Sequence, residues 1–261
     1  MNFNHIRDSV LTILINLEFT LNNVVRAVQR RDAVIVIDVL RCCSTIVMAL
    51  ANGAKGVISA KTLREARTLH ENHPEFVLAG ERGGLKPKGF DLGNSPLEFS
   101  SEKVMGKHII LTTTSGTKAI ALSKNARWVL IGAFLNAKAV AEAALKIAER
   151  EGIGISLALS GRKRRFSLED FICAGAIAES LPIEKVEQSD ASFAALLTFQ
   201  QARVSLNNVI QRGYHAQYLK GIGLKKDVEF CCQTNVFEIV PFLKEGMIIP
   251  LKFPNEDLTI S

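Results

Sequence analysis

The chain has 261 residues, 48% hydrophobic and 22% charged, which is enough for one large α/β domain or two smaller ones with a sizeable core. This composition excludes an intrinsically disordered protein, and the longest apolar runs, residues 10–15 and 33–37, are far too short to cross a bilayer. The formal charge of +6 admits nucleic acid, an acidic membrane surface or small anions as partners.

The five cysteines include two adjacent pairs, Cys42-Cys43 and Cys231-Cys232, and none has the C-x-x-C spacing of a zinc or redox site. Disulfides between neighbouring cysteines are strained, so buried free thiols are expected. The first thirty residues lack a small-residue cleavage site, so no secretory signal is predicted. Together these features predict a cytoplasmic protein.

Along the chain, short β-branched runs alternate with longer segments of helical period, a pattern typical of parallel α/β proteins. Strands are predicted at residues 33–40, 56–60, 76–80, 108–113, 128–133 and 153–160. Helices are predicted at residues 44–52, 63–70, 117–123, 137–150 and 168–180. Because residues 34–37 are all apolar, the sheet is expected to be buried on both faces. The predicted fold is a three-layer α/β/α arrangement with a mostly parallel sheet.

After Pro182 the pattern changes to a long helical region at residues 191–219, broken near Gly213, with strand-like pieces at 228–232 and 247–251. We divide the chain into two α/β parts, residues 1–126 and 127–261, although no low-complexity linker separates them and one compact unit is the alternative. A site is expected between these parts or at the carboxyl ends of the strands.

Polar or small residues follow five of the predicted strands. Ligands of open parallel sheets bind outside the carboxyl ends of the strands, so these positions predict one shared site for a small charged ligand. The residues concerned are Asp38 and Arg41, Glu81 and Arg82, residues 112–117, residues 132–136, and Ser160-Gly161 ahead of Glu169 and Asp170.

Residues 112–117, Thr-Thr-Thr-Ser-Gly-Thr, lead into a predicted helix. Hydroxyls and free amides at a helix N-terminus form an anion cradle, and plain helix capping by Ser115 or Thr117 is the alternative. The run lacks the lysine of the Walker pattern, so it does not predict nucleoside triphosphate binding.

The segment Ser167-Leu168-Glu169-Asp170 matches a helix capping box, and its acids are alternatively magnesium ligands or proton donors. The five histidines have no ligand spacing, and each, including His215, is predicted to be a surface or core residue.

Two carboxylates have competing explanations. Asp38 either forms a salt bridge with Arg41 at the sheet rim or binds a metal ion, because a buried carboxylate without a cation is costly. Asp91 is either a turn former with Gly93 and Asn94 or a further metal ligand.

Much of the positive charge lies in residues 26–31 and in the run Arg162-Lys163-Arg164-Arg165. Such runs are usually solvated faces, and two tyrosines and one tryptophan offer little aromatic surface for stacking bases. Nucleic acid and membrane are therefore not expected as partners, whereas a small anionic phosphorylated substrate is. Self-association into a homo-oligomer stays open.

Five blocks, in order, carry a family likeness: Val36-Ile37-Asp38-Val39-Leu40-Arg41, Ala79-Gly80-Glu81-Arg82, Gly89-Phe90-Asp91-Leu92-Gly93-Asn94-Ser95-Pro96, Thr113-Thr114-Ser115-Gly116-Thr117 and Ser167-Leu168-Glu169-Asp170. Together they resemble the 2-phosphosulfolactate phosphatase family across about residues 33–181, and a fainter similarity continues through Asp227.

The resemblance implies a Mg²⁺-dependent phosphatase that releases phosphate from 2-phospho-3-sulfolactate, on the route to coenzyme M. The site residues that it implies fall into three groups, whose roles are our interpretation. They are the catalytic residues Asp38, Arg41, Glu169 and Asp170; the substrate-binding residues Arg82, Asn94, Thr113, Thr114, Ser115, Gly116 and Thr117; and the metal ligands Asp38, Glu81 and Asp91. The nucleophile is either a metal-positioned water or Asp38 itself.

The chain departs from the family pattern at two of these blocks. Cys42-Cys43-Ser44-Thr45 follows Arg41 where Ala-Thr-Thr is common, and Ser115 takes the place of an asparagine. The basic run before Ser167 is also unusual. The alternatives are a phosphatase for another small anionic phosphoester, a non-catalytic anion-binding module and, with the least support, a nucleic-acid-binding protein that uses residues 162–165.

Overall fold

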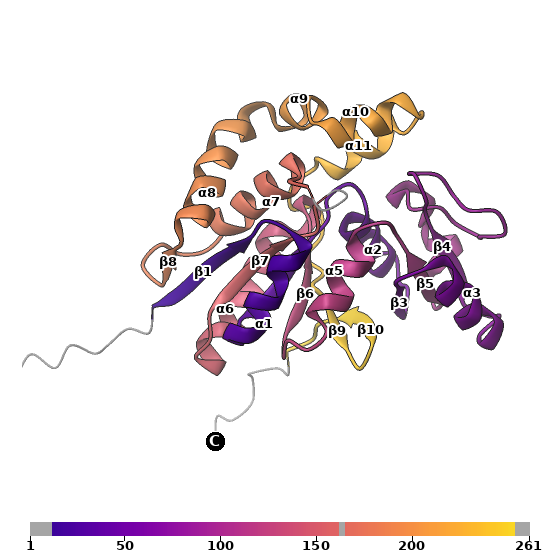
Figure 1. Ribbon diagram of the computed structural model, residues 1–261, viewed down its shortest axis with the longest axis horizontal. Coiled ribbons are helices and arrows are strands. Elements are labelled where there is room, and N and C mark those ends of the chain that lie inside the picture. Colours follow the sequence, from indigo (N-terminus) through magenta and orange to yellow (C-terminus); the bar gives the residue numbers. More distant parts are fainter. Residues whose placement is uncertain (1–11, 162–164, 254–261) are drawn as a thin grey trace, which may run out of the picture.

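The computed structural model describes residues 12–161 and 165–253, in which a ten-stranded sheet is covered by helices on both faces (Figure 1). The strands are β1 (Ile13–Glu18), β2 (Ala33–Ile37), β3 (Gly56–Ala60), β4 (Val77–Gly80), β5 (His108–Thr112), β6 (Val129–Gly132), β7 (Ile155–Leu159), β8 (Val186–Gln188), β9 (Pro241–Lys244) and β10 (Met247–Pro250). The helices are α1 (Val24–Arg30), α2 (Cys42–Ala51), α3 (Leu63–Asn72), α4 (Ser101–Val104), α5 (Gly116–Ser123), α6 (Ala137–Glu151), α7 (Leu168–Glu179), α8 (Asp190–Ala202), α9 (Leu206–Gln211), α10 (Tyr214–Gly221) and α11 (Lys225–Cys231).

The sheet order is β4-β5-β3-β10-β9-β6-β2-β7-β1-β8. Two parallel groups, β4-β5-β3 and β6-β2-β7-β1-β8, are joined by the antiparallel hairpin β9–β10. The hairpin pairs with β3 through Met247 and Ile248, and with β6 at the single register position of Leu130 and Phe242. The C-terminal part of the chain therefore links the two groups into one sheet.

Strand β2 shows why the molecule has three layers. All five of its residues are buried, and they alternate between two separate clusters. Val34 and Val36 pack with residues of α1, α2 and α5, whereas Ile35 and Ile37 pack with residues of α6, α7 and α8. Successive side chains of a strand point to opposite faces, so an all-apolar strand requires a helical layer on each side. The predicted α/β/α class is confirmed.

The six predicted strands correspond to β2 to β7, and the predicted helices to α2, α3, α5, α6 and α7. The prediction of a strand at residues 228–232 is wrong, because these residues belong largely to helix α11. Its buried residues Asp227, Val228 and Cys231 are spaced at three and four positions, which is the helical period. Strands β1, β8 and β9 and helices α1 and α4 were not predicted.

Strands from both sides of the predicted division at residues 126 and 127 are neighbours, since β2 lies between β6 and β7.

All five cysteines are buried and free, as expected. Across residues 12–161 and 165–253, no helix has the length and apolar character needed to cross a membrane.

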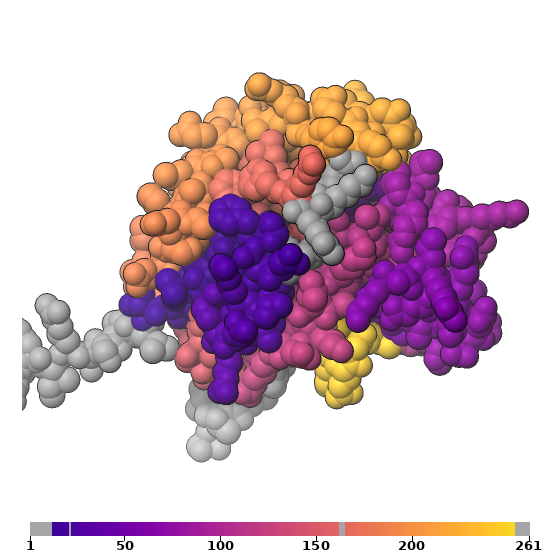
Figure 2. Space-filling model, in the orientation of Figure 1, coloured from indigo at the N-terminus to yellow at the C-terminus, as the bar shows by residue number. Residues whose placement is uncertain are grey.

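The helices α8 to α11 form an arc over one edge of the sheet (Figure 1). In the space-filling view the orange and yellow end of this arc lies against the purple segment that contains β4 (Figure 2). A hydrogen bond of 2.9 Å from the Tyr218 hydroxyl to the Gly83 carbonyl joins the two segments. The C-terminal helices therefore close over the carboxyl edge of both parallel groups.

Candidate active site

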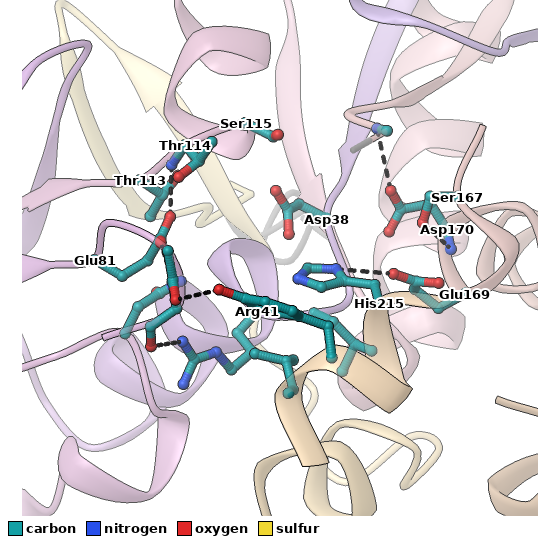
Figure 3. A pocket seen from close by; sticks show the side chains of 17 residues that line it. Asp38, Arg41, Glu81, Thr113, Thr114, Ser115, Ser167, Glu169, Asp170 and His215 are labelled. Carbon is teal, nitrogen blue, oxygen red and sulfur yellow. Dashed lines mark hydrogen bonds and ion pairs between the residues drawn. The ribbon is translucent and has the colours of Figure 1, made fainter. Parts of the chain in front are cut away.

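A cavity of about 140 Å³ lies at the carboxyl ends of the strands, where the two parallel groups meet. Each of β2, β4, β5 and β7 contributes lining residues from the loop that follows it, and α7 and α10 supply the rest. The polar side chains that line it are Asp38, Arg41, Glu81, Asn94, Thr113, Thr114, Ser115, Ser167, Glu169, Asp170, His215 and Tyr218 (Figure 3). The predicted location of the site is thus where the structure has a cavity.

Three helices begin at this cavity. Arg41, Ser115 and Ser167 are the residues that directly precede α2, α5 and α7, and all three line it. The N-terminus of a helix carries partial positive charge and unpaired amide groups. Three such ends directed at one space favour a bound anion.

The first turn of α5 approaches β2 closely because residue 116 is a glycine. A Cβ atom there would lie 2.5 Å from the Cys42 Cβ atom and 2.7 Å from Asp38 Oδ2. Any larger residue would push the loop between β5 and α5 (residues 113–115, here called the threonine loop) away from Asp38. Gly116 therefore sets the spacing of the two walls.

Asp38 follows the buried strand β2, and Figure 3 shows its carboxylate between the threonine loop and the His215 ring. Its Oδ1 accepts a hydrogen bond of 3.2 Å from the Cys42 amide. Burial raises the pKa of Asp38 to about 6, and the charge of Glu81 adds to the rise, whereas His215, Ser160 and Cys42 oppose it. A buried carboxylate in this state binds a cation favourably.

Arg41 does not pair with Asp38. Its Nη1 donates to Asp227 Oδ2 at 2.6 Å, and its Nη2 donates to the Gly84 carbonyl at 2.6 Å. Both charged side chains are almost completely buried, at 3% and 4% exposure. Asp227 also accepts a hydrogen bond of 2.7 Å from the Ser95 hydroxyl. The pair fixes the guanidinium at the cavity wall.

Glu81 holds two loops in place through backbone amides. Its Oε1 accepts from the Thr114 amide at 2.6 Å, and its Oε2 accepts from the Gly84 amide at 2.8 Å. Within the threonine loop, the Thr117 amide donates to Thr113 Oγ1 at 3.1 Å. Capping of α5 is therefore performed by Thr113, and Ser115 makes no side-chain cap hydrogen bond.

Asp170 joins the ends of β2 and β7. Its Oδ1 accepts from the Val39 amide at 2.8 Å, and its Oδ2 accepts from the Ser160 hydroxyl and the Gly161 amide, each at 3.3 Å. Burial and the charges of Asp38 and Glu169 raise its pKa well above the usual value. Ser167 Oγ accepts from the Asp170 amide at 3.3 Å, which is the serine half of the predicted capping box.

Glu169 has a partner that the sequence did not indicate. His215 Nδ1 lies 3.1 Å from Glu169 Oε1, and the imidazole lines the cavity. The two residues are 46 positions apart and come from α7 and α10, so no spacing rule connects them. The sequence predicted only a surface or core residue at position 215, and it gave no sign that His215 lines the cavity beside Glu169.

Several predicted site residues lie apart from this group. Arg82 donates to the Glu81 carbonyl and to Thr112 Oγ1, and burial lowers its pKa. Asp91 is exposed, and its Oδ2 accepts from the Leu78 amide at 2.8 Å. Thr117 is buried against Thr113. Residues 162–164 of the basic run lie outside the described part of the chain.

The predicted ligand set Asp38, Glu81 and Asp91 is not brought together. Among the described residues, no group of three or more His, Cys, Asp or Glu side chains is arranged to hold a metal ion. Mg²⁺ commonly uses only one or two carboxylates and completes its shell with waters and substrate phosphate. Asp38 is such a carboxylate, and the buried Asn94 Oδ1, from another lining residue, has no hydrogen-bond partner in the described structure. This donor set fits a magnesium ion shared with a substrate.

The described residues that line the cavity carry more negative than positive charge, which favours a bound cation. Four carboxylates, from Asp38, Glu81, Glu169 and Asp170, face one guanidinium and one imidazole among the described lining residues. Helix N-termini offset part of this negative charge, and a further cation would favour the binding of a multiply charged anion.

Comparisons with known proteins agree with the geometry. A family model described as 2-phosphosulpholactate phosphatase matches residues 19–246. A probable 2-phosphosulfolactate phosphatase of Thermotoga petrophila is 44% identical over 227 residues, which cover 87% of this chain and 95% of the relative. The protein of the same name from Thermotoga maritima is 43% identical with the same coverage, and that of Carboxydothermus hydrogenoformans is 41% identical over 83% of this chain and 89% of its own length.

Proposed function

We propose, from the premise that the chain belongs to the 2-phosphosulfolactate phosphatase family, that it hydrolyses 2-phospho-3-sulfolactate to sulfolactate and phosphate with Mg²⁺ as cofactor. The family likeness inferred from the five sequence blocks is confirmed by the family match. A role on the route to coenzyme M stays a prediction.

One observation carries the proposal: Asp38, the threonine loop, Arg41 and the Glu169–His215 pair face a single cavity at the N-termini of α2, α5 and α7. A phosphate group suits such a place, because amides at helix N-termini donate to its oxygens. An anion-binding module would gain nothing from the four carboxylates, which favour a cation-dependent reaction instead.

Different lining groups bind different parts of the substrate. The threonine loop and the start of α5 bind phosphoryl oxygens, and Glu81 holds that loop in place through the Thr114 amide. Arg41 binds a second oxyanion of the substrate with its remaining donors, because Asp227 and Gly84 fix the orientation of its guanidinium.

Asp38, assisted by Asn94, would hold the magnesium ion. When bound, the ion supplies positive charge that neutralises the phosphoryl oxygens in the transition state. Asp38 is also placed to orient the attacking water or to act as the acceptor of the phosphoryl group. An acid-quenched reaction with labelled substrate separates these two routes, because only the second leaves label on the protein.

The proposal is tested by phosphate release from a panel of small phosphomonoesters that includes 2-phospho-3-sulfolactate and 2-phospholactate, with Mg²⁺ and with EDTA. We expect Mg²⁺-dependent release that is fastest with 2-phospho-3-sulfolactate. Release that is faster from another member of the panel would reassign the substrate. No release from any member would contradict the enzyme assignment itself.

A further inference from the structure

The His215–Glu169 pair is the part of the cavity whose chemistry the sequence analysis did not anticipate. His215 comes from α10, which lies over the carboxyl edge of the sheet, and its side chain is 23% exposed. Glu169 is almost completely buried, at 3% exposure, in the first turn of α7. A buried carboxylate bound to one ring nitrogen fixes the orientation of the imidazole and favours a proton on that nitrogen.

The pairing leaves the other ring nitrogen available. Glu169 Oε1 occupies the Nδ1 side at 3.1 Å. Figure 3 shows the ring between Glu169 and Asp38, with its opposite edge directed into the cavity. When the imidazole carries both protons, Nε2–H is a donor that faces the space next to Asp38, where the phosphoester is expected to lie.

The other acids of the cavity are already engaged. Both oxygens of Asp170 accept hydrogen bonds, from Val39, Ser160 and Gly161, and both oxygens of Glu81 accept from backbone amides. Glu169 is bound to His215. Among the lining residues that the structure describes, His215 therefore has a ring nitrogen that faces the cavity and forms no hydrogen bond within the protein.

We propose that His215 is the catalytic acid that protonates the leaving oxygen of the phosphoester, and that Glu169 is its positioning residue. This inference rests on the proposed phosphatase function and identifies the residue that performs one of its steps. It replaces the sequence prediction that Glu169 or Asp170 is the proton donor.

The bond between phosphorus and the ester oxygen breaks with its electron pair moving to oxygen, while the incoming oxygen nucleophile forms the new bond to phosphorus. The ester oxygen takes the proton from His215 Nε2 and leaves as the alcohol. His215 then regains a proton from water, so the sum is phosphoester plus water giving alcohol plus phosphate.

The test compares wild type with His215→Gln on 2-phospho-3-sulfolactate, in the presence of Mg²⁺. Removing a general acid lowers kcat by about 10²- to 10⁴-fold, and we expect KM to change much less. The second measurement is the ¹⁸O isotope effect at the bridging ester oxygen. It should be small in the wild type, where the oxygen is protonated as the bond breaks, and larger in the variant, where the oxygen leaves with negative charge.

Glu169→Gln provides a second route to the same result if His215→Gln fails to fold, which circular dichroism would show. It should raise the isotope effect with a smaller loss of kcat, because a positioning residue acts through the imidazole. His73→Gln is the matched control, since His73 also lies near a glutamate, Glu75 at 3.7 Å, but on the exposed surface. It should leave both measurements unchanged.

Three outcomes decide the matter. A His215→Gln enzyme within about threefold of wild type would overturn the inference, since loss of a general acid costs far more. A large loss of kcat with an unchanged isotope effect would also overturn it, because His215 would then act elsewhere in the reaction. A wild type without phosphatase activity on any phosphomonoester would instead refute the proposed function.

Discussion

Asp38 and Asp170 are buried carboxylates whose pKa values the fold raises. Burial raises the pKa of both carboxyl groups. The charge of Glu81 adds to the rise at Asp38, and the charges of Asp38 and Glu169 add to the rise at Asp170. The folded-state pKa of Asp38, about 6, lies above its usual value of 3.8. Its contribution to stability is therefore present below about pH 4 and is lost as pH rises through about 6.

Replacing Asp38 with asparagine should remove that loss. Without magnesium, we expect the free energy of unfolding near neutral pH to rise by about 1 to 3 kcal/mol, while activity is abolished. The gain should vanish below about pH 4, where the wild-type carboxyl is protonated in both states. Urea denaturation at several pH values measures this; a variant less stable than wild type at neutral pH would show that Asp38 is held by favourable contacts.

Removing the carboxylate of the Arg41–Asp227 pair should lower the free energy of unfolding, whereas removing that of Asp38 should raise it. Asp227→Asn leaves a buried guanidinium without its counter-charge, and we expect a loss of about 3 to 5 kcal/mol in unfolding free energy. The matched control is Glu229→Gln on the same helix, whose ion pair with Lys225 is exposed and should contribute less than about 1 kcal/mol. Equal effects of the two changes in urea denaturation would refute a structural role for the buried pair.

The sequence located Asp38, Arg41, Glu81 and Asp170 correctly at one edge because each follows or adjoins a strand end. It did not reveal the partner of Arg41 or of Glu169, since Asp227 and His215 come from helices that fold back over the sheet. Asp91 shows the converse case. The sequence left it as either a turn former or a metal ligand, and in the structure its carboxylate accepts a hydrogen bond from the Leu78 amide.

At the scale of elements, the start of α5 determines the width of the cavity. Gly116→Ala places a methyl group within 3 Å of both Cys42 and Asp38, so the threonine loop must shift. A shift of about 1 Å in a phosphate-binding loop is expected to lower kcat/KM by about 10²-fold. Gly221→Ala is the control, because a Cβ atom there meets nothing within 4 Å. Similar kinetics for both variants and wild type would show that the loop tolerates the added atom.

The elements that were predicted share strong local signals. Strands β2 to β7 are apolar runs bounded by polar or glycine residues, and the helices between them have a clear period. Strand β1 was missed because Asn16 interrupts its apolar run. The run at residues 10–15 was considered only as a possible membrane segment. The strand-like piece predicted at residues 247–251 is β10, but its partner β9 was missed. The pairing of this hairpin with β6 and β3, far away in sequence, leaves no local pattern.

At the scale of the whole molecule, the cavity depends on contacts between distant parts of the chain. Asp227 binds Arg41 and Ser95, and Tyr218 binds the Gly83 carbonyl, so α10 and α11 are tied to both parallel groups. A ligand that binds in this cavity contacts all of these parts and should stabilise the fold as one unit.

Thermal unfolding with Mg²⁺ and inorganic phosphate measures this coupling without turnover. At a ligand concentration of about 100 times Kd, stabilisation of about 2.7 kcal/mol is expected for wild type. Asp38→Asn should show no additional rise in Tm when Mg²⁺ is added, because its metal ligand is missing. An equal rise with Mg²⁺ in both proteins would place the metal elsewhere.

The proposed function requires that this cavity hydrolyse a phosphomonoester with magnesium bound at Asp38. The most direct measurement is phosphorus NMR of 2-phospho-3-sulfolactate incubated with wild type or Asp38→Asn, with Mg²⁺ or EDTA, in ¹⁸O-enriched water. We predict that only wild type with Mg²⁺ forms inorganic phosphate, and that the phosphate carries ¹⁸O because the bond to phosphorus is cleaved. Phosphate formed equally by Asp38→Asn, or by wild type in EDTA, would contradict magnesium-dependent hydrolysis at Asp38.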